Sequence, residues 1–252
     1  MIGFSCPPLA VRPFQEAAEL VMPHFEHWEI ISEADHWLPE IREQVKDLIE
    51  TTDMGLSVHG PYSDVNLSAF DTGTRKRSVN IFLELIDICA ELGIGPVTAH
   101  PGVIGPIQYW DKARVPKLTR QSLEDIASRA GDNSVLLALE NMPDMRGTIC
   151  RTAAEMEAML QDLDIGMCLD IGHAHTNGQI GEMMKLQEKF INIHVHDNHG
   201  DRDAHLPLGE GDIDFSVLKN LDGYKGNFII EAKRPEMEEA LASKMTLQKI
   251  FE

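Results

Sequence analysis

Cysteine is scarce in this chain of 252 residues, which contains only four cysteines. They stand far apart, at Cys6, Cys89, Cys150 and Cys168, and no two form a C-x-x-C pair. This distribution disfavours a disulfide framework and a zinc finger, and it is typical of a protein in a reducing cytoplasm. We therefore expect a cytoplasmic protein.

Long apolar runs are also absent. No segment approaches the ~18 uninterrupted apolar residues of a transmembrane helix. The first residues, MIGFSCPPLAVRPF, lack the basic segment and the sustained apolar core of a signal peptide. We expect no association with a membrane.

Positive charge is in short supply, because Lys and Arg number 22 against 41 Asp and Glu, a net charge of −19. A surface this negative repels phosphate backbones unless basic residues gather locally, so broad nucleic-acid binding is disfavoured. Hydrophobic residues make up 43% and charged residues 25% of the chain. That balance is typical of a packed globular protein and excludes a disordered or collagen-like chain.

Short β-rich runs alternate along the chain with longer amphipathic segments. Eight such runs match one closed (β/α)8 barrel of parallel strands, which typically fills about 250 residues. We therefore expect a single TIM-barrel domain spanning residues 1–252. A doubly wound open sheet is the alternative, but no glycine-rich nucleotide-binding motif follows the first run. The expected strands are Ile2–Cys6, Trp28–Ser32, Gly55–Gly60, Pro96–His100, Val135–Asn141, Gly166–Asp170, Ile191–His196 and Phe228–Ala232.

Helical periodicity or capping signals mark four of the intervening segments. Thr152 is the expected N-cap of one helix, and Glu155 stands three residues later, as in a capping box. The basic trio Arg75-Lys76-Arg77 is expected to begin another helix, either as a solvated start or as a phosphate-binding site. The expected helices span residues 75–94, 152–163, 215–224 and 235–251.

A His, Asp or Glu follows the apolar run of six expected strands. In a barrel these carboxyl ends converge on the face where active sites are built. Imidazole and carboxylate suit zinc, manganese or cobalt, and buried carboxylates need a cation. One such residue alone is most simply a salt-bridge or turn residue, but the recurrence predicts a metal site. The residues are His59, His100, Glu140, Asp170 with His173, His194 with His196, and Glu231.

The spacing within the last of these segments supports the same site. His194 and His196 are two residues apart on a strand, so their side chains point to one side. Asp203 and His205 follow in a loop that can fold back over the barrel mouth. Gly172 permits a tight bend between Asp170 and His173. Four further histidines lack this convergence and are expected at the surface or behind the site: His24, His27, His175 and His199.

These residues make the chain similar to the xylose isomerase-like barrel superfamily. That group includes sugar and sugar-phosphate isomerases and epimerases and the endonuclease IV type of apurinic endonuclease. The resemblance covers nearly the whole chain, and its most specific pieces are CLDIGHAH and HVHDNHGDRDAHLPLGEGDIDF. It implies a TIM barrel with one to three divalent ions, zinc or manganese. The positions matching ligands shared across the superfamily are Glu140, Asp170, His194 and Glu231. The positions matching the additional ligands of the trinuclear zinc endonucleases are His59, His100, His173, Asp203 and His205.

The chain departs from those endonucleases where they contact DNA. Tyr62-Ser63-Asp64 stands in place of their Tyr-Leu pair, and Ser63 cannot act as an apolar wedge between bases. The loop SEADHWLPEI contains no Lys or Arg, and NHGDR before Asp203 carries little positive charge. Duplex DNA is therefore a disfavoured partner.

The favoured hypothesis is a metal-dependent isomerase or epimerase of a small sugar or sugar phosphate. Such an enzyme removes a proton next to a carbonyl while a divalent ion stabilises the enediolate. By resemblance, Glu140 and Glu231 are the catalytic pair. Glu29 is expected to be an exposed surface glutamate, with binding of substrate hydroxyls as its alternative role.

The second hypothesis is a zinc-dependent phosphodiester hydrolase of the endonuclease IV type, which the nine matching ligands favour. A non-catalytic metal-binding barrel is the third. The sequence leaves open the sugar, its phosphorylation state, the identity and number of the ions, and whether the protein forms a homo-oligomer.

Overall fold

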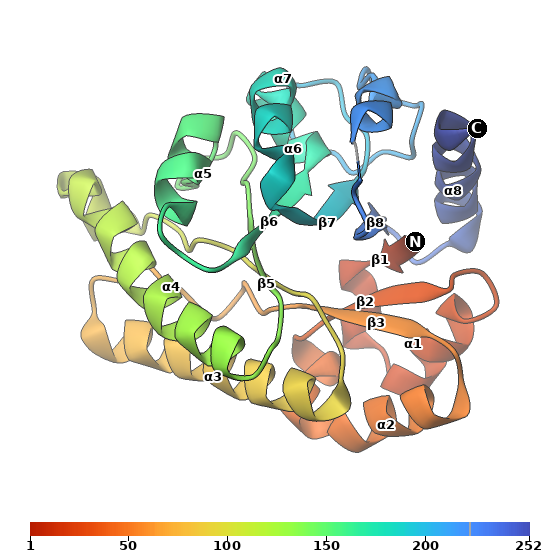
Figure 1. The fold of residues 1–252 in the computed structure, drawn as a ribbon, viewed down its shortest axis with the longest axis horizontal. Helices are drawn as coiled ribbons and strands as arrows, with labels where there is room; N and C mark the ends of the chain where they lie inside the picture. Colours follow the sequence, from red (N-terminus) through yellow and green to blue (C-terminus); the bar gives the residue numbers. More distant parts are fainter. Residues whose placement is uncertain (222) are drawn as a thin grey trace.

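The computed structural model describes residues 1–221 and 223–252, and its strands form one closed barrel. Each strand pairs in parallel with the next in sequence, and β8 returns to pair with β1 (Figure 1). The predicted (β/α)8 barrel is therefore confirmed. The strands are β1 (Ile2–Ser5), β2 (His27–Ile31), β3 (Gly55–His59), β4 (Val97–Ala99), β5 (Leu137–Glu140), β6 (Gly166–Asp170), β7 (Phe190–Val195) and β8 (Asn227–Glu231).

All eight predicted strands are present, and their ends differ from the prediction by at most two residues. The largest difference is at the start of β5, which was expected at Val135 and begins at Leu137. Val135 still belongs to the preceding turn, because its N–H bonds to the Ala130 carbonyl at 2.9 Å. Ser134, with a φ of 56°, reverses the chain there.

The α-helices of the described residues lie outside the strands (Figure 1). None of these helices combines the length and apolar character needed to cross a membrane. Their bounds are α1 (Phe14–Val21), α2 (Leu38–Thr51), α3 (Thr72–Leu92), α4 (Val115–Asp132), α5 (Ala153–Leu160), α6 (Ile171–Thr176), α7 (Ile180–Met183) and α8 (Met237–Phe251).

Short 3-10 helices connect several strands to the helices. One of them corrects the helix predicted for residues 215–224, because the segment forms a single 3-10 stretch that ends at Asn220. Asp222, within the predicted range, lies outside the described residues. The 3-10 helices are η1 (Pro7–Val11), η2 (Ala34–His36), η3 (Pro106–Trp110), η4 (Lys112–Arg114), η5 (Met184–Lys189) and η6 (Phe215–Asn220).

The basic trio does not begin its helix, contrary to expectation. α3 begins at Thr72, and the Asp71 carboxylate caps it by accepting from the Thr74 N–H at 2.7 Å. An acidic cap suits the positive end of the helix dipole, whereas cations there oppose it. Arg75 lies one turn later and donates to the Ala69 carbonyl at 2.6 Å.

Polar side chains fill part of the barrel interior. Asn192 on β7 donates through Nδ2 to Glu29 Oε2 on β2 at 2.7 Å and to Thr98 Oγ1 on β4 at 3.2 Å. These strands are not neighbours in the sheet, so the hydrogen bonds cross the barrel. Outside the sheet, apolar residues pack against the helices, as where Trp28 stacks on Phe14 at 5.2 Å. These polar side chains therefore lie on the strand faces that point into the barrel.

The predicted capping box at α5 is present, and it gives a test of local stability. Thr152 Oγ1 accepts from the Glu155 N–H at 3.3 Å, and Glu155 Oε2 accepts from the Thr152 N–H at 3.4 Å. We expect Thr152→Ala to lower the free energy of unfolding by about 1 kcal/mol, because a helix N–H loses its acceptor. Thr152→Ser keeps the hydroxyl and should retain most of the stability. Urea denaturation measures both, and equal stability of the two variants would contradict this role of the cap.

Candidate metal centre and catalytic cavity

The nine residues predicted as metal ligands all lie at the carboxyl-terminal end of the barrel. They come from six strand ends and the loops that follow, and they form one connected cluster. His59, Glu140, Asp170, His194 and Glu231 lie in the last two residues of β3, β5, β6, β7 and β8. His100 follows β4, His173 lies in α6, and Asp203 and His205 lie in the loop after β7.

Glu140 is the centre of the cluster, and only 1% of its surface is exposed. Its Oε2 lies 3.2 Å from Nε2 of His59 and 3.1 Å from Nε2 of His100. Its Oε1 lies 3.3 Å from Nδ1 of His173 and 3.5 Å from Nδ1 of His194. Burial alone would raise the pKa of the Glu140 carboxyl, but the nearby His100 and His194 imidazoles hold that pKa well below its usual range. The carboxylate is therefore ionised and surrounded by imidazoles.

Glu29 is buried, with none of its surface exposed, so the expectation of a surface glutamate is wrong. Side chains alternate along β2, and this one points into the barrel, where Oε1 lies 2.8 Å from Nε2 of His194. Its Oε2 accepts from the Ser57 hydroxyl at 3.0 Å as well as from Asn192. Burial would raise the pKa of Glu29, but the charge on His194 outweighs it and lowers that pKa.

The contact with Glu29 fixes the orientation of His194. With Nε2 donating to Glu29, the other nitrogen, Nδ1, faces Oε1 of Glu231 at 3.1 Å and Oδ2 of Asp170 at 4.0 Å. This Nδ1 is buried and makes no hydrogen bond among the described residues. Metal-ligating histidines commonly donate one ring N–H to a carboxylate and bind the ion through the other ring nitrogen.

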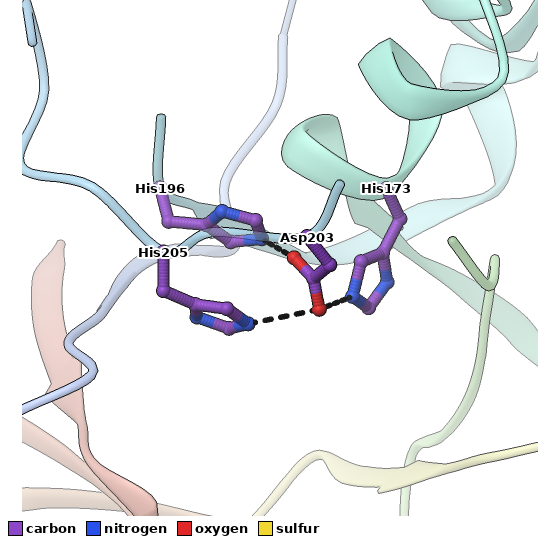
Figure 2. A group of neighbouring side chains, drawn as sticks. All are labelled: His173, His196, Asp203 and His205. Carbon is purple, nitrogen blue, oxygen red and sulfur yellow. Dashed lines mark hydrogen bonds and ion pairs between the residues drawn. The ribbon is translucent and has the colours of Figure 1, made fainter. Parts of the chain in front are cut away.

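A second group of donors lies beside the first and is shown in Figure 2. Oδ2 of Asp203 lies 3.3 Å from Nε2 of His173 and 3.2 Å from Nε2 of His205. Oδ1 of Asp203 lies 3.4 Å from Nε2 of His196, whose ring stacks on His205 with centroids 3.8 Å apart. The predicted ligand set did not include His196, although its two-residue spacing from His194 placed it on the same side of the strand.

Charge in this second group is shared between acid and base. Burial would lower the pKa of His205, but its hydrogen bond with Asp203 and the charge of Glu231 raise it to about 9. Burial would raise the pKa of Asp203, but hydrogen bonds from His173 and His205 hold it below its usual range. Protons on the imidazoles thus compensate the carboxylates, and a cation bound there would displace those protons.

The donor set fits a divalent ion. Atoms that could ligate one ion lie within 4.8 Å of one another in five overlapping groups. Several buried donor atoms also lack a hydrogen-bond partner among the described residues, including Oδ2 of Asp170 and Oδ1 of Asp203. Unpartnered buried carboxylate oxygens are costly, and a cation would satisfy them. The groups are His59–Glu140–His194, Glu140–Asp170–His173, Glu29–His194–Glu231, Asp170–His196–Glu231 and His173–His196–Asp203–His205.

Asp197, directly after β7, holds the loop that carries Asp203 and His205. Its side chain is buried and accepts four backbone N–H bonds, at 2.9 to 3.2 Å. Gly211 permits this close approach, because a Cβ there would lie 2.3 Å from Oδ1 of Asp197. These hydrogen bonds hold the beginning and the end of the loop against the same carboxylate. The four donors are the N–H groups of Asn198, Gly209, Gly211 and Ile213.

The remaining predicted features take different places. Tyr62 stacks on His100 with centroids 5.1 Å apart, and Ser63 Oγ donates to Glu33 Oε2 at 2.5 Å. His27 is buried behind the site, and its Nε2 lies 2.9 Å from Oγ of Ser57. Burial lowers the pKa of His27 to about 4. Of the other histidines expected at the surface or behind the site, His24 and His175 are partly buried and His199 is exposed. His36, for which no role was predicted, is buried.

The cluster opens into a cavity of about 340 Å³ at the barrel mouth. Seven of the nine predicted ligands line it, together with Tyr62. The other lining residues come mainly from the loops that follow β4 and β5. The full lining is Pro7, Ile31, His59, Tyr62, His100, Val103, Glu140, Met142, Pro143, Met145, Thr148, His173, Asp203, His205 and Glu231.

Comparison with known proteins agrees with this architecture. Residues 14–249 match the model of a protein family described as the xylose isomerase-like TIM barrel. The crystal structure of a D-tagatose 3-epimerase-like protein superposes with a TM-score of 0.91 at 31% identity, covering 99% of this chain and 97% of that one. An uncharacterised protein of Methanocaldococcus jannaschii is 33% identical over 91% of this chain and 81% of its own length.

Two further similarities bear on chemistry. A probable endonuclease 4 of Aquifex aeolicus is 29% identical over 65% of this chain and 64% of its own length. The structure of the IOLI protein with a zinc atom has the same fold, with a TM-score of 0.81 at 21% identity, covering 100% of this chain and 98% of that one. Proteins with this fold thus include at least one that binds a metal ion.

The Asp197 loop yields a prediction that needs no substrate. We expect Asp197→Asn to lower the free energy of unfolding by about 2 kcal/mol, because the new amide turns a donor toward backbone N–H groups. Proteolysis between residues 198 and 212 should also become faster. Asp212→Asn is the matched control, since the Asp212 side chain is exposed and, among the described residues, pairs with the exposed His199 at 3.0 Å. Unfolding curves and limited proteolysis measure both, and identical behaviour of the two variants would contradict the role of Asp197.

Proposed function

This chain belongs to the xylose isomerase-like TIM barrel family, and we propose that it is a divalent-metal-dependent isomerase or epimerase of a small sugar. The observation that carries the proposal is the pair Glu140 and Glu231. Both carboxylates line the cavity, and both lie within 3.5 Å of Nδ1 of His194. Similarity to a D-tagatose 3-epimerase-like protein along almost the entire chain supports this reaction class.

In this proposal Glu140, Asp170, His194 and Glu231 hold a shared zinc or manganese ion. A divalent ion bound there would act as a Lewis acid that stabilises negative charge developing next to a carbonyl. Glu29 keeps the Nδ1 of His194 directed at the ion by accepting from Nε2. Asp170 is fixed by Asn141, whose side chain bonds to both the N–H and the carbonyl of Asp170 at 2.9 Å.

Glu140 and Glu231 perform the proton transfers. They project from β5 and β8, so a substrate between them presents one carbon to two carboxylates from different directions. The pKa of each carboxyl is held below its usual range, so both are ionised at neutral pH and one can accept the proton. The other carboxylate takes up a proton from solvent and gives it to the opposite face of the same carbon, and the first then releases the abstracted proton to solvent.

A second ion is proposed at His173, Asp203 and His205, with His196 as a further donor. Together with the shared ion this makes two ions per chain, within the range of one to three that the resemblance implies. All four cysteines are free and buried, which supports the proposal of a reducing cytoplasm as the compartment.

The shared-ion assignment is tested by Glu231→Gln. We expect metal content to fall and turnover to drop by about 10² or more, because one ligand and one proton acceptor are lost together. Glu238→Gln is the matched control, since Glu238 is exposed on α8. Elemental analysis and steady-state kinetics measure the two effects. Full occupancy and turnover in Glu231→Gln would show that the shared site is wrongly assigned.

A phosphodiester hydrolase is the second candidate function. The donor group around Asp203 favours it, because two or three ions together can bind a phosphate and activate water. The surroundings oppose it. Ser63 and Tyr62 donate their backbone N–H groups to the Glu33 carboxylate, at 2.6 and 2.5 Å, so an acid lies where a DNA backbone would approach.

We expect no incision of duplex DNA containing an abasic site at physiological salt. The reason is the net charge of −19 together with Glu33 and Ser63 at the expected contact. Incubation of zinc-loaded protein with an end-labelled abasic duplex measures the activity, and protein treated with a chelator gives the background. Metal-dependent incision at many turnovers per chain would reverse the ranking of the two functions.

A further inference from the structure

We propose that the substrate directs its oxygen atoms only toward the ion-binding cluster and turns an uncharged, apolar group to the apolar side chains of the cavity. This inference rests on the proposed function and narrows its substrate class, since it selects an unphosphorylated molecule. It follows from the apolar part of the cavity lining, which we call the wall. The wall consists of Pro7, Ile31, Val103, Met142, Pro143 and Met145.

The backbone polar groups of Val103, Met142, Pro143 and Met145 in this wall are already hydrogen-bonded within the protein. The Val103 N–H donates to Asn66 at 3.1 Å, and its carbonyl accepts from Asn66 and Ser68, both at 2.9 Å. The Met142 N–H donates to the Cys150 carbonyl at 3.1 Å, and the Met142 carbonyl accepts from Asn177 at 2.9 Å. The N–H and carbonyl groups of Val103 and Met142 therefore already have hydrogen-bond partners within the protein.

The second half of the wall is equally saturated. The carbonyl of Pro143 accepts from the Thr148 hydroxyl and the Met145 N–H, both at 2.8 Å. The carbonyl of Met145 accepts from the Thr148 hydroxyl at 2.8 Å and from the Thr148 N–H at 3.3 Å. Thr148 lies in the same loop, and its hydroxyl proton is already directed at these two carbonyls. Two prolines, Pro7 and Pro143, contribute no N–H at all.

The wall also lacks a side chain with a fixed positive charge. Among the described residues that line the cavity, none is Lys or Arg. Arg146, beside Met145, lies over the ring of Tyr109 at 5.2 Å. A phosphate turned toward this wall would lose water and gain no cation, and a hydroxyl would lose water and gain no partner. An apolar group loses nothing there and removes the Met and Val side chains from water.

The test uses hydroxamates, which bind divalent ions through two oxygens and can carry different substituents. Binding of acetohydroxamate, benzohydroxamate and phosphonoacetohydroxamate to the zinc-loaded protein is measured by calorimetry. We expect benzohydroxamate to bind about 10-fold tighter than acetohydroxamate, and phosphonoacetohydroxamate to bind no tighter than acetohydroxamate. The inference would be overturned if phosphonoacetohydroxamate bound tightest, or if acetohydroxamate and benzohydroxamate bound equally.

A charge placed on the wall should reverse the preference. Met145 and Val103 are 53% and 48% exposed, so arginine can be accommodated at either position. We expect Met145→Arg and Val103→Arg each to tighten phosphonoacetohydroxamate binding about 10-fold and to weaken benzohydroxamate binding. Leu136→Arg is the matched control, because Leu136 is 60% exposed just before β5, at the other end of that strand from the cavity. An equal change in all three variants would overturn the assignment of the wall.

The proposed function has a separate readout. Exchange of the proton next to the carbonyl of D-tagatose into deuterated water, followed by NMR, reports the proton-transfer chemistry itself. If the hydroxamate order holds while no such exchange occurs with this sugar or its 6-deoxy analogue, the inference about the wall stands and the epimerase proposal fails. If exchange occurs and the 6-phosphate ester reacts fastest, the epimerase proposal stands and the inference fails.

Discussion

Four carboxylates are buried close together at one end of this barrel, and their negative charge must be compensated. Glu29 and Asp170 have no exposed surface, Glu140 has 1% and Glu231 has 9%. Ionised groups in such a place are stable only when cations or charged hydrogen-bond donors surround them. The histidines at the neighbouring strand ends meet that need with protons, and a metal ion would meet it better. The chemistry proposed for the site follows from this electrostatic demand.

Closure of the barrel makes the compensation possible. His194 on β7 reaches Glu29 on β2 across the interior, and Ser57 and Asn192 complete the shell of that carboxylate. In an open sheet with the same strand order, β2 and β7 would lie near opposite edges, and these side chains could not meet. The polar side chains inside the barrel therefore support the proposed site, because they direct Nδ1 of His194 toward the place where an ion would bind.

Much of this arrangement could be predicted from the sequence, because strand periodicity and strand ends are local properties. The position of Glu140 after an apolar run was enough to place it at the mouth. Glu29 was misjudged, because its burial depends on which face of β2 turns inward once eight strands close. The helix α3 begins at Thr72 because Asp71 caps it, and the 3-10 segment of residues 215–220 is capped by Asp214. His196 was missed because only the folded loop brings Asp203 to it.

The hydrogen bonds that Asp197 receives divide the following loop into two parts with different freedom to vary. The base is fixed, because four backbone groups converge on one buried carboxylate. The stretch from His199 to Arg202 lies at the surface, with three of its four residues exposed, and no donor of the cluster belongs to it. Added residues there would lengthen an exposed turn without moving the base. This turn is accordingly a place where relatives with the same cluster of carboxylates and imidazoles can acquire new contacts to larger substrates.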